Sequence, residues 1–440
     1  MYREVEQFRY AVHGLLLDWP AANRPQNNHG VPVMRILFAD SLAESAIQRL
    51  RDGGDNCVVD ASLTAETLPE HISGFDALVV RSTKVTAATL EAADQLGLVV
   101  RAGAGTNTID ADRAAELGIF VCNVPGRNAI AVAELAIGLM FAIDRHIAPA
   151  TADLRAGEWN KQTYSKARGL FGSTLGIIGM GAIGIEVAQR ACACGLRVIA
   201  EPGYDRTRDV RRRMADIGVA EVPDRATLLA ASDIVSLHVP GGTDTIGMVD
   251  AEFLAAMKPD AVLINTSRGE VVDEVALLAA LDSTDLRAGL DVFADEPSGG
   301  IGQISSELAR HPKVTATHHI GASTEQAQMA VAEGTAEVIE AYRQGVVLDC
   351  VNLEQVPNRT ATLSIRHHDR VGVLACVLQE LSRLHLNVAN MQNRIFSGSE
   401  AAVAIIEVGG TIDDELLGTL SAIEHVICAS VLDTDPEAAQ

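Results

Sequence analysis

The chain has 440 residues, 48% of them hydrophobic and 21% charged, which is too long for one ordinary core and too apolar for a disordered protein. Its formal net charge of −23 disfavours nucleic-acid backbones and anionic membranes as partners. An anionic substrate would therefore have to meet a local cluster of Arg and Lys.

The N-terminal residues 1–33 show no apolar period and no signal-peptide core, so we expect a loose extension there. The most apolar helical stretch, residues 131–143, is too short to span a bilayer. The seven cysteines are odd in number and lack framework spacing, which indicates reduced thiols in a cytoplasmic protein. Cys192 and Cys194 face apart on a helix, so we expect no metal site.

Short apolar runs at residues 34–39, 77–80, 98–100 and 119–122 alternate with helical stretches such as 42–50 and 87–96. This alternation predicts a parallel sheet covered on both faces. A long helical stretch, residues 128–145, leads away, and a helix from about 323 to 342 is expected to return. We therefore expect a substrate-binding domain made of residues 34–127 and 323–352.

Six further apolar runs, at 174–178, 197–200, 234–239, 261–265, 288–292 and 314–317, are separated by helical stretches. They predict a doubly wound, Rossmann-type nucleotide domain over residues 128–322. Beyond a linker around Pro357, residues 359–440 follow the order βαββαβ. That order is typical of a small ferredoxin-like α+β domain.

A glycine-rich loop follows the first run of the second series, with Gly179, Gly181 and Gly184 in the spacing GxGxxG. These glycines allow a tight turn, close approach of a pyrophosphate and close packing of helix on strand. The first helical amides, including those of Ala182 and Ile183, would meet the phosphate charge.

About twenty residues later, Glu201 stands where an acid holds the ribose hydroxyls, which favours NAD over NADP. The Arg-rich run at residues 206–213 keeps NADP as the alternative.

Three polar residues each follow an apolar run of the second series: Arg268, Glu296 and His319. Because open α/β sheets bind ligands at the carboxyl ends of their strands, we expect these side chains to meet. Arg268 can hold a carboxylate with its forked donors, and His319 can transfer a proton. Glu296 would orient the imidazole and favour its charged form. The set suits hydride and proton transfer at a carbon next to a carboxylate, so we expect an enzyme.

These motifs, together with residues 268–277, 290–297 and 319–323, resemble the D-isomer-specific 2-hydroxyacid dehydrogenases. The resemblance implies that Arg268, Glu296 and His319 are catalytic, and that Asp291 meets the nicotinamide carboxamide. Other implied positions line the cofactor cleft (Ala104, Val239, Thr266), face the substrate carboxylate (Gly103, Gly105), or lie near a substrate phosphate (Arg81, Ser82). Lys161 would reach the site of a neighbouring subunit in a homodimer or homotetramer.

Within the family, the resemblance is strongest to the branch that oxidises 3-phospho-D-glycerate to 3-phosphohydroxypyruvate with NAD, in the first step of L-serine biosynthesis. The loop at residues 81–84 is a residue shorter than in many relatives, which leaves open an NAD(P)-dependent reductase of hydroxypyruvate or glyoxylate. A different class, a nucleotide-sensing corepressor without catalysis, shares the fold.

Residues 365–374 resemble the first loop of ACT domains, which pair side by side and often bind an amino acid. His367, Asp369 and Asn387 occupy positions that contact serine in some relatives. The resemblance implies an amino-acid effector, with a purely dimerising module as the alternative.

Overall fold

The computed structural model describes residues 33–203, 206–297, 301–353, 361–398, 400–410 and 412–432. Residues 1–32 of the expected extension and the expected linker around Pro357 lie outside these ranges. Contacts divide the chain into two compact units, whose boundary in the sequence lies between Asn352 and Leu353. Within the ranges described, no helix combines the length and the apolar character needed to cross a bilayer.

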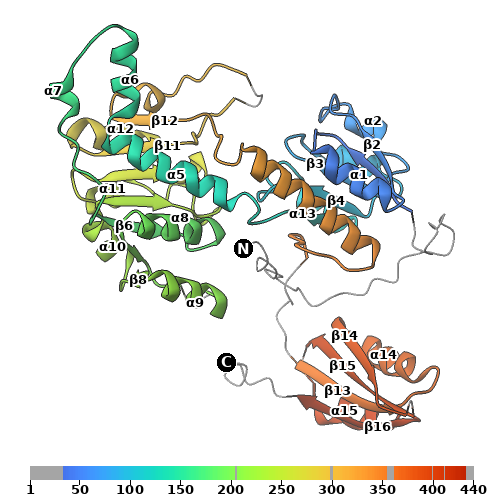
Figure 1. The fold of residues 1–440 in the computed structure, drawn as a ribbon. Helices are drawn as coiled ribbons and strands as arrows, with labels where there is room; N and C mark the ends of the chain where they lie inside the picture. The colour runs from blue at the N-terminus through green and yellow to red at the C-terminus, as the bar shows by residue number, and fades with distance from the viewer. Residues whose placement is uncertain are drawn as a thin grey trace. The chain divides into compact units, whose positions relative to one another are not determined.

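The first unit begins with a five-stranded parallel sheet of order β2-β1-β3-β4-β5 (Figure 1). Its strands are β1 (Arg35–Phe38), β2 (Asn56–Val59), β3 (Ala77–Val80), β4 (Leu98–Arg101) and β5 (Phe120–Cys122). Its own helices are α1 (Glu44–Asp52), α2 (Leu68–His71), α3 (Ala87–Ala92) and α4 (Ala111–Glu116). Ile36 and Phe38 pack into one core cluster and Leu37 into another, because successive strand residues face opposite ways. The prediction of a parallel sheet buried on both faces is confirmed.

Two elements here differ from the sequence prediction. The helix expected over residues 87–96 ends at Ala92, because Ala93 is extended and the Asp94 carboxylate turns to accept hydrogen bonds from Ser73 Oγ and Gly74 N. Strand β2 was not predicted. It is an edge strand with no buried residue, so it lacks the apolar pattern by which the other strands were recognised.

Helix α13 (Glu325–Arg343) packs on this first sheet although it follows the second one in sequence. Ala332, Ala336 and Ile339 lie on one face of the helix, in the same core cluster as strands β1, β3 and β4. The segment after the helix then runs along β5, where Val351 N donates to Val121 O at 2.8 Å. The chain thus leaves the unit from the free edge of the first sheet.

A seven-stranded parallel sheet of order β12-β11-β10-β9-β6-β7-β8 forms the rest of the unit. Its strands are β6 (Thr174–Ile178), β7 (Arg197–Ala200), β8 (Ala220–Glu221), β9 (Ile234–Leu237), β10 (Val262–Asn265), β11 (Arg287–Leu290) and β12 (Val314–Ala316). The six predicted strands are present, and the two-residue β8 adds a seventh. The strand order reverses at β6, where sheets of this kind bind their ligands beyond the carboxyl ends of the strands.

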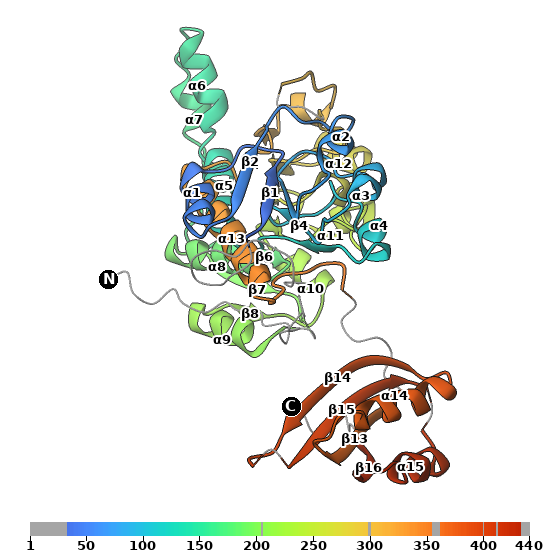
Figure 2. The ribbon, with the colours of Figure 1, turned by 90° about the vertical axis from the view of Figure 1, so that its right-hand side faces the viewer.

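Helices cover both faces of this sheet. The helices of this part are α5 (Ala129–Asp144), α8 (Ala182–Ala193), α9 (Arg208–Ile217), α10 (Arg225–Ala231), α11 (Ala251–Ala256) and α12 (Glu274–Ser283), with 3-10 turns at Gly269–Val271 and Leu308–Arg310. Helices α6 (Ile147–Arg155) and α7 (Lys161–Tyr164) project from the sheet in both views (Figure 2). No residue of α6 is buried within this chain.

The second unit contains β13 (Ala361–His368), α14 (Val373–Arg383), β14 (Asn387–Ile395), β15 (Ala401–Gly409), α15 (Asp414–Ser421) and β16 (Val426–Leu432). Its antiparallel sheet has the order β14-β15-β13-β16. Alternate residues of β15 are buried beneath the two helices. This is the ferredoxin-like βαββαβ arrangement predicted from the sequence.

Candidate active site

The glycine-rich loop joins β6 to α8 with a backbone that only glycine suits at two of its three positions. Gly179 has φ +96°, and a Cβ there would lie 2.4 Å from His238 O. A Cβ at Gly184 would lie 2.1 Å from Gly179 O, so helix and turn are in close contact. A Cβ at Gly181 would meet no atom within 4 Å, and this residue caps α8 without a side chain. Open space at Gly181 therefore lies beside the first backbone amides of α8, which have no partner within the helix. A bound pyrophosphate requires both features.

Glu201 follows β7 and is held by two arginines that flank it. Arg225, the first residue of α10, donates from Nε and Nη2 to the two carboxylate oxygens at 2.9 and 3.1 Å. Arg206 Nη2 donates to the Glu201 carbonyl at 2.5 Å. The sequence prediction had included Arg206 in the run that kept NADP as the alternative, and it had not considered Arg225.

The turn after β10 is ordered by Asn265, whose side chain accepts from Ser267 and donates to the Arg268 carbonyl at 2.9 Å. Thr266 is buried, and its Oγ1 has no hydrogen-bond partner. An unsatisfied buried hydroxyl is costly unless a ligand completes it. This fits the predicted place of Thr266 beside the cofactor.

Asp291 is buried and organises the loop that carries His319. Its carboxylate accepts from Thr317 Oγ1 at 2.6 Å, Ile320 N at 2.9 Å and Gly321 N at 2.8 Å. Its carbonyl accepts from His319 N at 2.8 Å, and His319 itself has φ +53°. The sequence had predicted a cofactor contact for Asp291 and had not shown this positioning task.

His319 and Glu296 meet beyond the carboxyl ends of β12 and β11, where His319 Nδ1 lies 2.6 Å from Glu296 Oε2. The hydrogen bond to Glu296 is the main reason why the pKa of His319 is raised, although partial burial opposes it. Burial tends to raise the pKa of Glu296, but hydrogen bonds from His319 and the Phe293 amide outweigh it, and that pKa is lowered. The pair thus favours imidazolium beside carboxylate, with Nε2 left for a substrate.

Three arginines converge beside this pair. Arg268 reaches the loop of the first sheet, since a Cβ at Gly105 would lie 2.6 Å from its Nη2. Arg101 Nε donates to Arg81 O at 3.1 Å, and burial together with the charges of Arg268 and Arg81 lowers the pKa of Arg101. Such a cluster is costly without an anion to neutralise it. The sequence had predicted roles for Arg81 and Arg268, but it had given Arg101 none.

Asp40 fixes the backbone of the loop that starts at Arg81. Its Oδ2 accepts from the amides of Arg81, Ser82 and Thr83 at 2.7, 3.1 and 3.0 Å. On the neighbouring loop, Asn123 Nδ2 donates to the Ala104 carbonyl at 2.5 Å, and Val124 N donates to Gly103 O at 3.0 Å. Asn123 directly follows β5 and Asp40 lies two residues after β1, and this placement is the signal that could have identified them.

A cavity of about 550 Å³ opens close to Arg268. Residues 106, 107 and 109–112 of the first part line one wall, and Gly241, Ile246 and Glu270 are among those that line the other. A Cβ at Gly241 would lie 3.1 Å from Arg268 Cγ, which places this wall beside the arginine. Val239, predicted to line the cofactor cleft, is two residues before Gly241.

His238, at the carboxyl end of β9, was not predicted. Its Nε2 lies 2.8 Å from Ser236 Oγ, and its Nδ1 has no partner. Burial lowers the pKa of the ring to about 3, so a neutral histidine lies directly behind the turn at Gly179.

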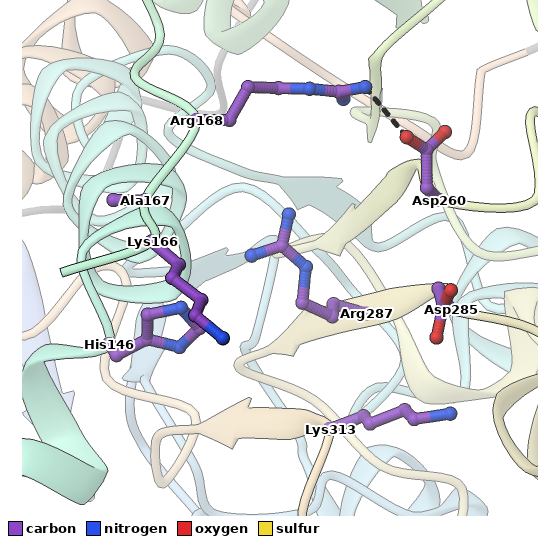
Figure 3. A pocket seen from close by; sticks show the side chains of 8 residues that line it. All are labelled: His146, Lys166, Ala167, Arg168, Asp260, Asp285, Arg287 and Lys313. Carbon is purple, nitrogen blue, oxygen red and sulfur yellow. Dashed lines mark hydrogen bonds and ion pairs between the residues drawn. The ribbon is translucent and has the colours of Figure 1, made fainter. Parts of the chain in front are cut away.

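A second cavity, of about 310 Å³, lies at the opposite end of the same sheet (Figure 3). Arg287 and Lys313 stand at the amino ends of β11 and β12, whereas the catalytic candidates follow carboxyl ends. Lys166 and Arg168 complete its basic lining, and Arg168 is paired with Asp260 at 2.6 Å. This cavity is separate from the candidate active site.

The remaining predicted residues belong to α7 and to the second unit. Lys161 is exposed on the projecting α7. In the second unit, His367 is buried, with Nδ1 2.8 Å from His368 O and Nε2 3.2 Å from Asn393 Oδ1, while Asp369 and Asn387 lie at the ends of β13 and β14. Across the part of the chain that the structure describes, no His, Cys, Asp and Glu cluster could hold a metal ion.

Comparisons with known proteins agree with this geometry. Residues 137–321 match the family model described as "D-isomer specific 2-hydroxyacid dehydrogenase, NAD binding domain". A D-3-phosphoglycerate dehydrogenase of Methanocaldococcus jannaschii is 40% identical over 329 residues, which cover 74% of this chain and 60% of that relative. The chain therefore spans less than two thirds of that relative's length.

A hydroxypyruvate reductase of Thermotoga maritima is 43% identical over 299 residues, covering 68% of this chain and 94% of the relative. Among solved structures, a glyoxylate reductase from Paecilomyes thermophila superposes with a TM-score of 0.65 at 28% identity. That match covers 73% of this chain and 98% of the other.

Proposed function

Because the chain belongs to the D-isomer-specific 2-hydroxyacid dehydrogenase family, we propose that it oxidises 3-phospho-D-glycerate to 3-phosphohydroxypyruvate with NAD, reversibly, in the first step of L-serine biosynthesis. The observation that carries this proposal is the convergence of Arg81, Arg101 and Arg268 beside the His319–Glu296 pair. Asp40 is an acidic group that acts on Arg101, but its Oδ2 already accepts from three amides. A substrate with a carboxylate at one end and a phosphate at the other would supply further anions for the three guanidinium groups.

In the oxidation direction, Arg268 and the loop at residues 103–105, which it reaches at Gly105, hold the substrate carboxylate. The hydroxyl on the next carbon then faces His319 Nε2, since Nδ1 is taken by Glu296. His319 accepts the hydroxyl proton as general base, and Glu296 stabilises the imidazolium that forms.

NAD, when bound, supplies the acceptor for the hydride that leaves the same carbon. The Gly181 turn and the first amides of α8 would hold its pyrophosphate, and Glu201 would hold its ribose. Thr266 Oγ1 offers a hydrogen bond that no protein group takes. For the reverse reaction, His319 starts protonated and returns its proton to the alkoxide.

The phosphate end of the substrate is assigned to Arg81 and Ser82, on the loop whose backbone Asp40 orders. Arg101 Nε is held by the Arg81 carbonyl, which leaves its Nη atoms for an anion. A doubly charged phosphate gains more from two guanidinium groups than a neutral hydroxymethyl group does.

The test is a comparison of substrates with NADH at equal enzyme concentration. We expect kcat/KM for 3-phosphohydroxypyruvate to exceed those for hydroxypyruvate and glyoxylate. Replacing Arg81 by Ala is expected to raise KM for the phosphorylated acid and to leave KM for glyoxylate nearly unchanged. Equal losses with both acids would refute phosphate recognition by Arg81.

A second candidate is reduction of an unphosphorylated 2-oxo acid. It is favoured by the similarity to the hydroxypyruvate reductase, of which the match covers 94%. The same histidine, glutamate and arginine serve this reaction. In the substrate comparison, it predicts turnover of hydroxypyruvate or glyoxylate in preference to the phosphorylated acid.

We further propose that residues 34–127 with 323–352 bind substrate, that residues 128–322 bind the nucleotide, and that residues 359–440 are an ACT-type regulatory domain. The ferredoxin-like order of the second unit supports the last assignment. His367 is buried in an internal hydrogen-bond network, so an amino-acid effector would meet Asp369 and Asn387 more directly. The exposed α6 supports a homodimeric or homotetrameric enzyme, which light scattering tests. The free thiols support a cytoplasmic enzyme.

A further inference from the structure

Two cysteines that are far apart in sequence stand opposite each other where the chain leaves the first unit. Cys122 ends β5, and Cys350 lies on the segment that runs antiparallel to it. The flanking hydrogen bonds run from Asn123 N to Asp349 O at 3.1 Å and from Val351 N to Val121 O at 2.8 Å. Neither bond joins the two cysteines themselves, so Cys122 and Cys350 form a non-hydrogen-bonded pair of an antiparallel ladder.

This register is the one that brings side chains closest. Residues of a non-hydrogen-bonded pair have Cα atoms about 4.5 Å apart and project to the same face. A disulfide needs Cα atoms about 4.4–6.8 Å apart, so the ladder already meets that requirement. The hydrogen bond with Cys350 is the largest cause that raises the pKa of the Cys122 thiol, followed by burial, so the two thiols are in contact.

We propose that Cys122 and Cys350 are a site of reversible oxidation, at which a disulfide ties residues 344–352 to the edge of the first sheet. The loop closed by this bond contains the whole seven-stranded sheet, and the bond lies at the point where the chain passes into the second unit. The other cysteines do not share this arrangement, since Cys57 lies on β2 at the far edge of the sheet and Cys376 is exposed on α14.

The chemistry requires a small disulfide, such as oxidised glutathione, as the oxidant. Cys350 is half-buried and reachable, so its thiolate attacks one sulfur of the small disulfide and expels one small thiolate. Cys122 is buried; it then attacks Cys350 Sγ, and its proton passes to the second small thiolate, which leaves as the thiol. Two electrons pass from the protein to the small disulfide, and dithiothreitol reverses the exchange.

The experiment uses the full reduced chain, incubated with oxidised glutathione, blocked with an alkylating reagent and digested without reduction. We expect loss of two of the seven thiols, and a cross-linked peptide that joins Cys122 to Cys350 and disappears with dithiothreitol. Cys350→Ser should abolish the cross-link, whereas Cys57→Ser, the matched control, should leave it intact. Hydrogen exchange at the Val351 amide should be slower in the oxidised chain.

Mixed disulfides at exposed thiols such as Cys376, with Cys122 and Cys350 both still alkylated, would overturn the proposal. So would glutathione retained on Cys350 with Cys122 free after the full incubation, because the opposed register places Cys122 against the mixed disulfide. Mass spectrometry of the unreduced digest distinguishes these outcomes without any measurement of enzyme activity.

Discussion

Glu296→Gln is the substitution that tests most directly how His319 works. The amide keeps the shape of the side chain but removes the charge that faces His319 Nδ1 at 2.6 Å. If His319 becomes an imidazolium during oxidation, the variant loses stabilisation in the transition state. Binding of NAD should be little changed, since Glu296 follows β11 and the glycine-rich loop follows β6, and two strands separate β11 from β6 in the sheet.

The magnitude follows from the exposure of the pair. A hydrogen bond to a charged group contributes about 1.5–3 kcal/mol when it is well protected from water. The side chains of His319 and Glu296 are 50% and 30% exposed, so solvent screening favours the lower value. Since about 1.4 kcal/mol corresponds to a factor of ten in rate, kcat should fall about tenfold. His319→Ala removes the base itself and should cost about 10²- to 10⁴-fold.

The assay is single-turnover oxidation, followed by NADH absorbance, at several pH values. Glu296 raises the pKa of His319, and oxidation needs the neutral ring, so activity is lost as pH falls through that raised value. The Gln variant should therefore keep its activity to lower pH. A variant within twofold of wild type, or one as impaired as His319→Ala, would refute the reasoning.

Three further outcomes are expected. Gly179→Ala should lower the urea midpoint of unfolding, because Gly179 has φ +96° and a Cβ there would strike a carbonyl oxygen. Gly181→Ala, at φ −78° in open space, should fold normally but raise KM for NAD, because its methyl group would occupy the room for the pyrophosphate. Asp291→Asn should cost about 1–3 kcal/mol of unfolding free energy in urea, because an amide cannot accept all three hydrogen bonds of the His319 loop. Glu201→Ala should free Arg225 and raise kcat/KM with NADP relative to NAD, and adding Arg225→Ala should remove that gain.

The sequence predicted the parts of the site that depend on local patterns. The apolar runs located every buried strand that carries a candidate residue at its carboxyl end, including those before Arg268 and His319. Parallel topology then brought these ends together. The glycine spacing predicted a turn whose conformation and close contacts at Gly179 and Gly184 are of the expected kind.

What the sequence did not predict depends on contacts between distant residues. Asp40 orders the loop at Arg81 from 41 positions away; its place just after a strand marks it as a candidate, but its partners cannot be read from the sequence. Arg101 received no predicted role, because its place in the site depends on two arginines from other segments, Arg81 and Arg268. The register that opposes Cys122 to Cys350 depends on the return of α13 to the first sheet. The sequence predicted that return but not how the segment after the helix pairs with β5.

The choice between NAD and NADP shows why charges must be assigned to partners before they are counted. A run of arginines after Glu201 favours NADP when it is read as a local positive charge. In the structure, Arg212 pairs with Asp209 and Arg213 with Glu186, so acidic side chains of the same domain neutralise these two charges. Arg225 donates to both oxygens of Glu201 and so fixes the carboxylate, which occupies the guanidinium group that could otherwise bind a phosphate. A carboxylate has about four acceptor positions, which leaves two for the ribose hydroxyls, and a 2′-phosphate there would face a fixed negative charge. The nearby arginine therefore supports the use of NAD.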